Sequence, residues 1–508
     1  MLKLRVVVAF AAMVFLLPLW RPVGAVPLAG SVVAGQAVIS QDGKETLVSQ
    51  ASDRAVIEWR DFSLKADEQL RFIVPSPTSA TLNRFLGASP LISGTILSNG
   101  GVYLVHPNGM VFDLNARVMA NRVEISTAAM ANFDFMNRET QDWVARQGSL
   151  KLDGVIEAPA IRATAGSLDI GGTLRAERGQ IELVAGTRLA TSEAAVIAAD
   201  GGSRGDGGTI RLWSDRFTDF RGTVTAMGGR EFGSGGKVEI SAAGVLDFQG
   251  SVATDAPHGG LGSLLLDPSD IEIVATRPEG EIEITASNQR FNAIASDQTS
   301  YLVVSKLVAS LQRNDVTVDA TTASEGDAAG SNRITVSSAV RWGGTGNLTL
   351  NAGKGGIVID AEISSTNSTK RSLTLKSIGS ISSSSAGVLS INKLTATSGL
   401  GGIFLGAANR MSTIGAISAR AGGSILLRNQ QGLALASGVT LSAGTGSVAL
   451  LLPGYDLTLL GSVTVEAGLL RLDLGDHRIK GKQSLTATGS TVYFTGAATG
   501  HQGTLNLG

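Results

Sequence analysis

Cysteine is absent from the 508 residues of this chain, and histidine occurs only four times. Without cysteine there are no disulfides, and a zinc site is not expected because such sites usually contain thiolates. The histidines are far apart, and none has a partner at the HExxH spacing of a metalloprotease. They are His106, His258, His477 and His501. We therefore expect no catalytic residues, no metal site and no cofactor, and we predict that the protein is not an enzyme.

Charged residues are also scarce, since they make up 17% of the chain against about 25% in an average protein. The net charge is −1, so we expect no attraction to nucleic acid or to an anionic membrane. Glycine, in contrast, is abundant, with 64 residues, and the hydrophobic content of 43% is enough for a buried core. These proportions predict an all-β fold of many short strands joined by glycine turns.

Long apolar runs are missing beyond the N-terminus, where residues 1–25 have the pattern of a secretory signal peptide. Lys3 and Arg5 precede the apolar run Val6–Leu17, and Val23-Gly24-Ala25 is a small-residue cleavage site. The run is shorter than the ~20 residues that span a membrane, so an uncleaved anchor is the less favoured alternative. We predict cleavage after Ala25 and a mature chain without a transmembrane segment.

The stretch of residues 92–127 carries the strongest turn signals in the chain. It contains two Asn-Gly pairs, Asn99-Gly100 and Asn108-Gly109, and both residue types tolerate positive φ. The apolar run Val102–Val105 between them is rich in β-forming residues. Pro107 ends this run because proline has no amide hydrogen to donate. The stretch predicts short strands joined by tight turns with positive φ.

This stretch resembles the N-terminal region of the two-partner secretion exoproteins, such as filamentous haemagglutinin. The residues that agree with the family pattern in order and spacing are Ile92, Gly94, Ile96, Asn99-Gly100, Val102, Leu104, His106-Pro107-Asn108-Gly109-Met110 and Phe112, preceded by Ile57-Glu58-Trp59, Phe62-Ser63 and Thr81-Leu82-Asn83-Arg84. His106 stands where the family usually has asparagine, and Asp113 where it has glycine. These departures concern the geometry of one turn and the choice of transporter.

The resemblance implies a fold, an export route and a partner. The implied fold is a right-handed parallel β-helix with an N-terminal cap and short antiparallel excursions. The implied route crosses the periplasm of a Gram-negative bacterium and a cognate outer-membrane β-barrel transporter, and it ends in secretion or at the cell surface. The absence of cysteine fits this route, because periplasmic disulfides would obstruct an unfolded chain, although a solenoid of this size also needs no disulfides. The family's secretion motif maps onto Asn99, Gly100, His106, Pro107, Asn108 and Gly109.

Regular alternation of apolar and polar residues continues from residue 148, as expected for strands with one inward and one outward face. A break at Gly259–Ile273, where Asp267-Pro268 ends one strand, predicts a domain edge near residue 265. We therefore expect a two-partner secretion (haemagglutination activity) domain over residues 26–265. Haemagglutinin-type β-helix repeats are expected over residues 266–508.

Two segments interrupt the strand pattern. Asn132–Gln147 contains Phe133, Phe135 and Trp143, which predict a packed excursion from the solenoid with a helical turn. Tyr301–Gln312 has apolar residues at near-helical spacing and is the best helix candidate.

Arg204-Gly205-Asp206 is an RGD triplet inside the glycine-rich run DGGSRGDGG. It is a candidate adhesion triplet, since integrin-type recognition uses an exposed RGD loop. The alternative, which we favour, is that these residue types are common in solenoid turns. The Asp-Gly-Gly groups beside it are a candidate Ca²⁺ site, but they lack the repeated nine-residue calcium motif and are better explained as turns.

The leading interpretation is a secreted or surface-exposed exoprotein with an adhesin-like function, which binds a glycan or a protein on a host or bacterial surface. One alternative is a β-helical enzyme that acts on polysaccharides, which needs Asp, Lys or Arg clustered on adjacent rungs. Another alternative is a truncated haemolysin or a carrier of a contact-dependent toxin. That alternative needs a distinct C-terminal effector domain, and none is visible in the sequence.

Overall fold

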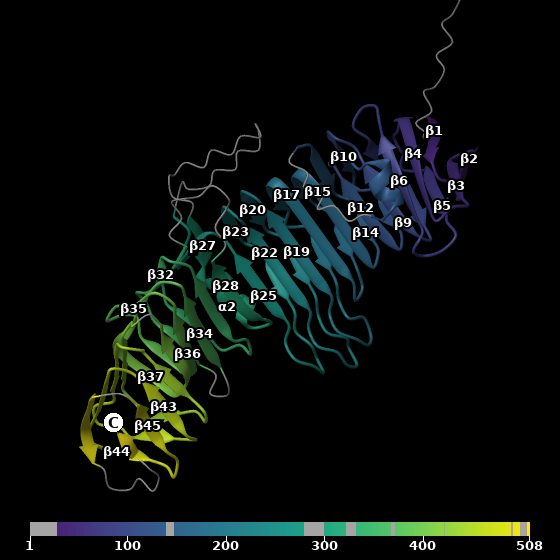
Figure 1. Ribbon diagram of the computed structural model, residues 1–508. Helices are drawn as coiled ribbons and strands as arrows, with labels where there is room; N and C mark the ends of the chain where they lie inside the picture. Colours follow the sequence, from purple (N-terminus) through teal and green to yellow (C-terminus); the bar gives the residue numbers. More distant parts are fainter. Residues whose placement is uncertain are drawn as a thin grey trace, which may run out of the picture.

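The computed structural model describes residues 28–138, 147–278, 299–321, 332–366, 371–420, 422–488, 491–497 and 505–507. They form an elongated β-solenoid of about 17 turns, called coils below (Figure 1). The predicted signal peptide with its cleavage after Ala25, Trp143 and His501 lie outside the described residues. Among the residues that are described, no helix is long and apolar enough to cross a membrane.

Each coil places a strand on each of three faces, and neighbouring strands on a face run parallel. The predicted parallel β-helix is therefore confirmed. Five long strands turn a corner and serve more than one face, namely β15 (Ala160–Ile170), β17 (Gln180–Thr191), β36 (Leu389–Ser398), β37 (Ile403–Ala419) and β44 (Leu469–Lys480). Face 1 also contains β4 (Arg54–Asp61), β6 (Ala80–Phe85), β9 (Gly101–Val105), β12 (Arg122–Ser126), β19 (Thr209–Ser214), β22 (Lys237–Ala242), β25 (Ser263–Asp267), β28 (Asp315–Ala320), β31 (Leu348–Ala352), β34 (Ser372–Ser377), β40 (Thr440–Ser442), β43 (Val463–Glu466), β45 (Leu485–Thr488) and β47 (Leu505–Leu507).

The other two faces follow the same order along the rod. Face 2 contains β7 (Leu91–Ile92), β10 (Gly109–Phe112), β13 (Ser149–Leu152), β20 (Phe217–Phe220), β23 (Val245–Phe248), β26 (Asp270–Val274), β27 (Thr299–Val303), β29 (Arg333–Val336), β32 (Gly356–Ile359), β35 (Ile381–Ser383), β38 (Ile425–Asn429), β41 (Ser447–Leu451), β44 (Leu469–Lys480) and β46 (Thr491–Ala497). Face 3 contains β3 (Glu45–Gln50), β5 (Gln69–Ile73), β8 (Thr95–Ser98), β11 (Arg117–Met119), β14 (Val155–Glu157), β16 (Thr173–Arg175), β18 (Val196–Ala198), β21 (Thr223–Thr225), β24 (Ser251–Ala253), β30 (Val340–Trp342), β33 (Ile363–Ser365), β39 (Leu433–Leu435) and β42 (Leu457–Leu459).

The N-terminal end of the solenoid is closed by antiparallel strands. β1 (Leu28–Ala34) pairs antiparallel with β4, and β2 (Ala37–Asp42) forms a hairpin with β3. Gly30 on β1 leaves room for the buried ring of Trp59, because a Cβ there would lie 2.6 Å from the ring. Among the strands that the structure describes, these are the only antiparallel pairs, and they form the predicted cap.

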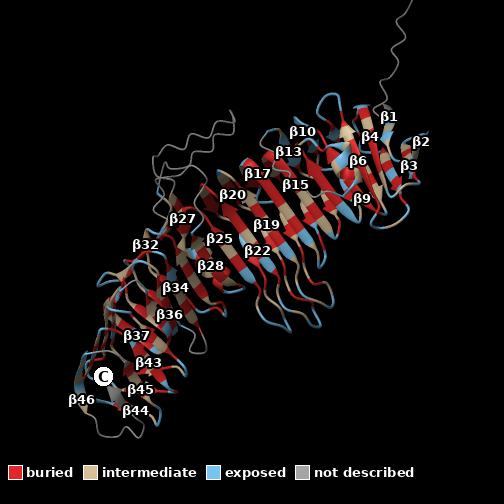
Figure 2. Cartoon of the chain, viewed as in Figure 1, coloured by how far each residue is buried: buried red, intermediate tan, exposed pale blue. Residues whose placement is uncertain are grey.

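The alternation of side chains fills the interior of the solenoid with apolar residues, and the buried residues run as continuous stripes along the rod (Figure 2). Aromatic rings fill the wide interior at both the cap and the middle. The largest fully buried side chains include Trp59, Phe72, Phe85, Phe112, Phe220, Phe248 and Trp342. Since each coil packs on its neighbours, the whole rod shares one core.

One coil between β24 and β30 departs from the three-strand rhythm. After β26 the chain leaves face 2 and returns as β27, which pairs in parallel with β26 and packs against β23. α2 (Val304–Leu311) then takes the place of a strand on face 3. The predicted helix Tyr301–Gln312 is thus right for residues 304–311 and wrong for its start. Residues 299–303 alternate between inward and outward, and Leu302 reaches the core from a strand.

The solenoid is continuous at the predicted domain edge near residue 265, because β25 pairs with β22 on one side and with β28 on the other. The division into 26–265 and 266–508 stays a prediction. The excursion expected at Asn132–Gln147 begins with α1 (Asn132–Met136), which buries Phe135 and exposes Phe133.

Candidate functional site

The segment His106-Pro107-Asn108-Gly109 forms the corner between β9 on face 1 and β10 on face 2. The amide of Gly109 donates to the carbonyl of His106, 3.1 Å away, and closes the turn. Gly109 has a φ of +104°. A Cβ at this position would lie 1.7 Å from the carbonyl oxygen of Ser149 in the next coil. Both the backbone conformation and the lack of space therefore require glycine here.

The ring of His106 ties this corner to the preceding coil. Its Nε2 donates to the carbonyl oxygen of Gly87 over 3.1 Å, and its Nδ1 accepts the amide hydrogen of Asn108 over 3.3 Å. The ring is only 1% exposed, whereas Pro107 and Asn108 are exposed. His106 is thus a buried brace in the place of the family's asparagine, and the exposed tip of the turn is Pro107-Asn108.

The corner at Asn99-Gly100 differs from the prediction, because Gly100 does not have a positive φ. β8 and β9 lie on different faces, so the chain turns a corner of the solenoid here and does not fold back as a hairpin. Glycine is needed for space, since a Cβ on Gly100 would lie 2.4 Å from Cγ2 of Val74. The carboxamide of Asn99 accepts from the amide of Val74 and donates to its carbonyl, each over 2.8 Å.

The two halves of the predicted secretion motif lie at opposite ends of β9, one at each corner. The corner at residues 106–109 is bordered by an apolar patch, which we define as Leu86, Leu91 and Val111. Leu91 and Val111 are partners across β7 and β10, and the exposed fractions of the three residues range from 36% to 52%. Exposed apolar patches of this kind on a soluble protein mark sites of protein contact.

The corner at Asn99 lines a groove of about 1030 Å³ on the other side of the same coils. The groove runs along the corner between face 3 and face 1, from β5 to β16. Its apolar lining includes Ile73 and Met119, and Arg71, Arg175 and Glu177 supply charge. The corner at residues 106–109 thus lies beside an exposed apolar patch, and the corner at Asn99-Gly100 lies beside a groove on the other side of the same coils.

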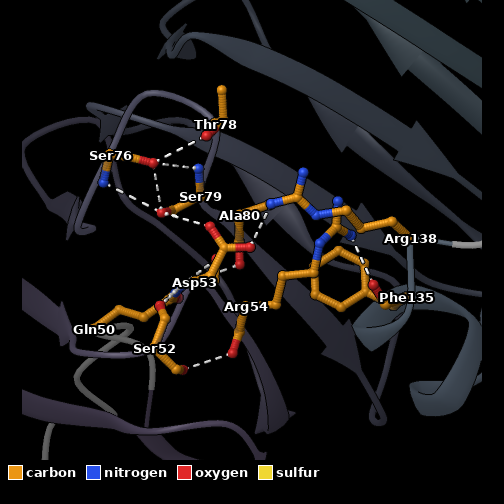
Figure 3. Close-up of polar contacts among 10 residues, drawn as sticks. All are labelled: Gln50, Ser52, Asp53, Arg54, Ser76, Thr78, Ser79, Ala80, Phe135 and Arg138. Carbon is orange, nitrogen blue, oxygen red and sulfur yellow. Dashed lines mark hydrogen bonds and ion pairs between the residues drawn. The ribbon is translucent and has the colours of Figure 1, made fainter.

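Sequence reasoning missed the arginines that hold the excursion with α1 onto face 1 (Figure 3). The guanidinium of Arg54 donates to the carbonyl of Phe135 over 2.7 Å and lies 4.6 Å from the centre of its ring. Arg138 pairs with Asp53 at 2.6 Å, and this hydrogen bond holds the pKa of the Asp53 carboxyl below its usual value. Burial lowers the pKa of Arg54.

Arg84 holds the start of the same excursion. Its guanidinium donates to the Glu58 carboxylate, to the carbonyl of Met130 and to the side chain of Asn132, each over 2.7 Å. The excursion covers an outward-facing apolar cluster on face 1 that is separate from the solenoid interior. The cluster consists of Val56, Ala80, Leu82, Val105, Met130 and Phe135. Glu58 and Arg84 both belong to the family pattern, and the pairing of β4 with β6 places these two residues side by side.

The RGD triplet lies at the corner after β18, several coils from the secretion motif. Arg204 is exposed and pairs with Glu231, and its guanidinium lies 5.9 Å from the centre of the Phe232 ring. Asp206 accepts the amide hydrogen of Ser234 over 2.7 Å. Both charged ends of the triplet are therefore engaged by the neighbouring coil, as expected for a structural turn.

The neighbouring Asp200 is also bound to the next coil. Its carboxylate accepts hydrogen bonds from the amide of Met227 at 2.8 Å and from the hydroxyl of Thr225 at 3.0 Å. Throughout the described ranges, no three His, Cys, Asp or Glu side chains are grouped so that they could hold a metal ion. The aspartates of this glycine-rich run are thus bound to the corner of the next coil.

Comparison with known proteins identifies the N-terminal coils. Residues 25–242 match the family described as the TPS secretion domain. A heme/hemopexin-binding protein of Haemophilus influenzae strain Rd is 28% identical over 142 residues, which are 26% of this chain and 16% of that protein. A second heme/hemopexin-binding protein of Haemophilus influenzae is 32% identical over 72 residues, 14% of this chain and 8% of its own length. The matches therefore span less than a fifth of these relatives.

Among solved structures, the crystal structure of the HMW1 secretion domain from Haemophilus influenzae is 15% identical and aligns with 92% of this chain and 98% of that chain. The TM-score is 0.30, which is too low to compare the two folds. The family match and the curated relatives agree with the motif in the N-terminal coils. Residues 25–242 of this chain therefore form a two-partner secretion (TPS) domain, the family that the motif in the N-terminal coils resembles.

Proposed function

We propose that this exoprotein is an adhesin-like, non-catalytic rod at the cell surface or free in the medium. In this proposal the transporter contacts the corner at residues 106–109 and its apolar patch, and the coils after residue 265 bind a glycan or a protein. The observation that supports the binding role is a polar face on four successive coils, formed by β28, β31, β34 and β36.

The centre of this polar face is a row of threonines in register. Thr317 pairs with Thr349, Thr349 with Thr374, and Thr374 with Thr395. A second polar row runs beside it and consists of Asp319, Asn351, Lys376 and Thr397. Adjacent strands are about 4.8 Å apart, so the face offers hydroxyl and amide groups at a regular spacing.

The polar face suits a polar, extended ligand such as a glycan chain. The four threonines are partly buried, and no hydroxyl of theirs is hydrogen-bonded to another residue that the structure describes. Polar groups without a protein partner can donate to and accept from a ligand without giving up an existing bond. The binding activity in the relatives' names belongs to those proteins, because the matches cover so little of their length.

Binding of the purified full-length chain to a glycan array and to immobilised cells tests this proposal. The variant Thr349→Arg/Thr374→Arg places two large charged side chains on the polar face, and we expect it to weaken binding about tenfold or more. Thr335→Arg on β29 places one such charged side chain on face 2 and is the control for an added charge away from the polar face. Equal binding by both variants, or no binding by the unaltered chain to any surface tested, would show that the polar face is not a binding site.

A further inference from the structure

A column of alternating charges runs along the outward side of face 1 in the middle of the secretion domain. We call it the charge ladder, and its members come from β12, β15, β17, β19 and β22. They are Glu124, Arg162, Glu182, Arg211 and Glu239. Each is the direct ladder partner of the next, so acid and base alternate over five successive coils.

Every neighbouring pair in the charge ladder is joined by an ion pair. Arg162 lies 3.1 Å from Glu124 and 3.0 Å from Glu182. Arg211 lies 3.5 Å from Glu182 and 3.1 Å from Glu239. The side chains are between 5% and 38% exposed, so solvent screens these pairs less than it screens fully exposed ones.

Apart from Ala163 on β15, the inward residues of the same strands do not distinguish one coil from another. The first inward position is Val or Ile on all five strands, namely Val123, Ile161, Ile181, Ile210 and Val238. The second is small or aliphatic, namely Ile125, Ala163, Leu183, Leu212 and Ile240. Apart from β15, where Ala163 is much smaller than its counterparts, a strand docked in the wrong order would therefore still bury an aliphatic pair, because residues of similar volume substitute for one another in a core at modest cost.

We propose that the charge ladder specifies the order in which these coils stack. If a coil is left out, two like charges become neighbours: Glu124 meets Glu182 without β15, and Arg162 meets Arg211 without β17. The same holds for Glu182 and Glu239 without β19. Skipping any single inner coil of the charge ladder therefore places like charges beside each other, and like charges that are directly opposite destabilise strand pairing.

The extent of the charge ladder agrees with this role. It ends where the coils become distinguishable by other means: Glu239 pairs with Leu265 on β25, in the coil that carries β27 and α2. At its other end Glu124 pairs with Tyr103 on β9, beside the excursion with α1. The alternation thus covers the coils whose strands are most alike. The inference concerns folding alone and does not depend on the proposed binding function.

Refolding of the full-length chain from urea gives the first test. In Glu239→Arg, Arg211 and residue 239 repel each other in the correct order, whereas skipping β19 brings residue 239 beside Glu182. We expect refolding to slow by about five- to tenfold. Lys237→Glu reverses a charge on the same strand outside the ladder and should leave the rate unchanged. Glu239→Gln removes the charge without reversing it, and its refolding rate should lie between the rates of Glu239→Arg and Lys237→Glu.

A disulfide reporter shows whether coils are skipped, and the chain has no cysteine that interferes. Gln180, Thr209 and Lys237 are successive members of an outward row beside the ladder. Gln180→Cys and Lys237→Cys are two coils apart, about 9.6 Å, which exceeds the Cα separation of about 7 Å that a disulfide can bridge. Gln180→Cys with Thr209→Cys is the positive control, because those positions are adjacent.

During oxidative refolding, Glu239→Arg should increase the Gln180→Cys/Lys237→Cys cross-link at least about threefold over the unaltered ladder. Reversing the whole ladder, together with Arg122→Glu to keep the pair of Arg122 with Glu124, restores the alternation and should return the cross-link to its original level. Equal cross-linking with and without Glu239→Arg would overturn the proposal. So would a reversed ladder that cross-links as much as the single reversal, since charge order would then not matter.

Discussion

Gly109 is the residue at which the geometry leaves least freedom. Gly109→Val forces a β-branched side chain into a positive-φ position and toward the carbonyl of Ser149. We expect a local strain of at least about 1–3 kcal/mol, which distorts the corner of the secretion motif while the other coils keep their contacts. Secretion should fall sharply and overall thermal unfolding should change little. The ratio of extracellular to periplasmic protein, with the transporter co-expressed, measures this.

Gly43 in the β2–β3 hairpin supplies the matched control. Its φ is +56°, and a Cβ there meets no atom within 4 Å, so Gly43→Val adds backbone strain without a clash at the motif. Normal secretion of Gly43→Val beside impaired Gly109→Val would assign the defect to the corner at residues 106–109. Undiminished secretion of Gly109→Val would mean that this corner is only part of the scaffold.

Asp219 is a buried carboxyl whose ionisation opposes folding. Burial raises its pKa above the ordinary 3.8, the Arg221 guanidinium opposes this rise, and the carboxylate of Asp247 adds to it. A raised folded-state pKa favours the protonated form, so this group's contribution to stability is complete below pH 3.8 and is lost as the pH rises through the folded-state pKa. At pH 7 the charged carboxylate therefore costs stability.

We expect Asp219→Asn to raise the melting temperature at pH 7 by about 1 °C, which corresponds to about 1 kcal/mol for a chain of this length. At pH 3 the difference should disappear, because both proteins then carry a neutral group. Arg221 keeps Asp247 as its partner at 3.2 Å. Circular dichroism melts at the two pH values measure the effect, and a lower melting temperature of the variant at pH 7 would show that the ion pair with Arg221 outweighs burial.

At the scale of elements, the excursion with α1 depends on side chains from the strands beneath it. Arg84→Met keeps the length of the stem but removes three hydrogen bonds, two of which reach the excursion. We expect residues 127–138 to lose about 2–3 kcal/mol of local stability. Hydrogen exchange should rise there and stay low in β6 and β9. Arg60→Met removes an exposed arginine of β4 and is the control. Hydrogen exchange in residues 127–138 of this variant should equal that of the unaltered chain.

The elements themselves were predictable where local signals are strong. β9, β10 and β12 follow from Asn-Gly pairs, Pro107 and β-forming residues, and the family resemblance supplied the solenoid. Asn99-Gly100 was misread because a corner between faces and a hairpin turn have the same local sequence. The start of α2 was misread because Leu302 and Leu307 fit both a strand and a helix. Only pairing with β26 decides that residue 302 lies in a strand.

The candidate site could be predicted only in part, because its parts are joined across long stretches of chain. The corner at Gly109 was found from its motif, but Ser149, which excludes a side chain there, belongs to the next coil. Arg84 and Met130 are 46 positions apart, and Asp53 and Arg138 are 85 apart. The charge ladder was readable in principle, as the alternation of Glu and Arg in strands that are otherwise alike.

At the scale of the whole molecule, the antiparallel cap gives the rod a direction. β1 occupies the outer edge of β4, so a new parallel strand can add only to the opposite edge. The parallel sheet can therefore be extended only at the end away from the cap. Two copies of the protein therefore cannot continue the parallel sheet of face 1 through their capped ends, and the parallel strands of face 1 add in one direction only. The first coil to fold therefore sets the register for all the others, and an error there is inherited along the entire rod.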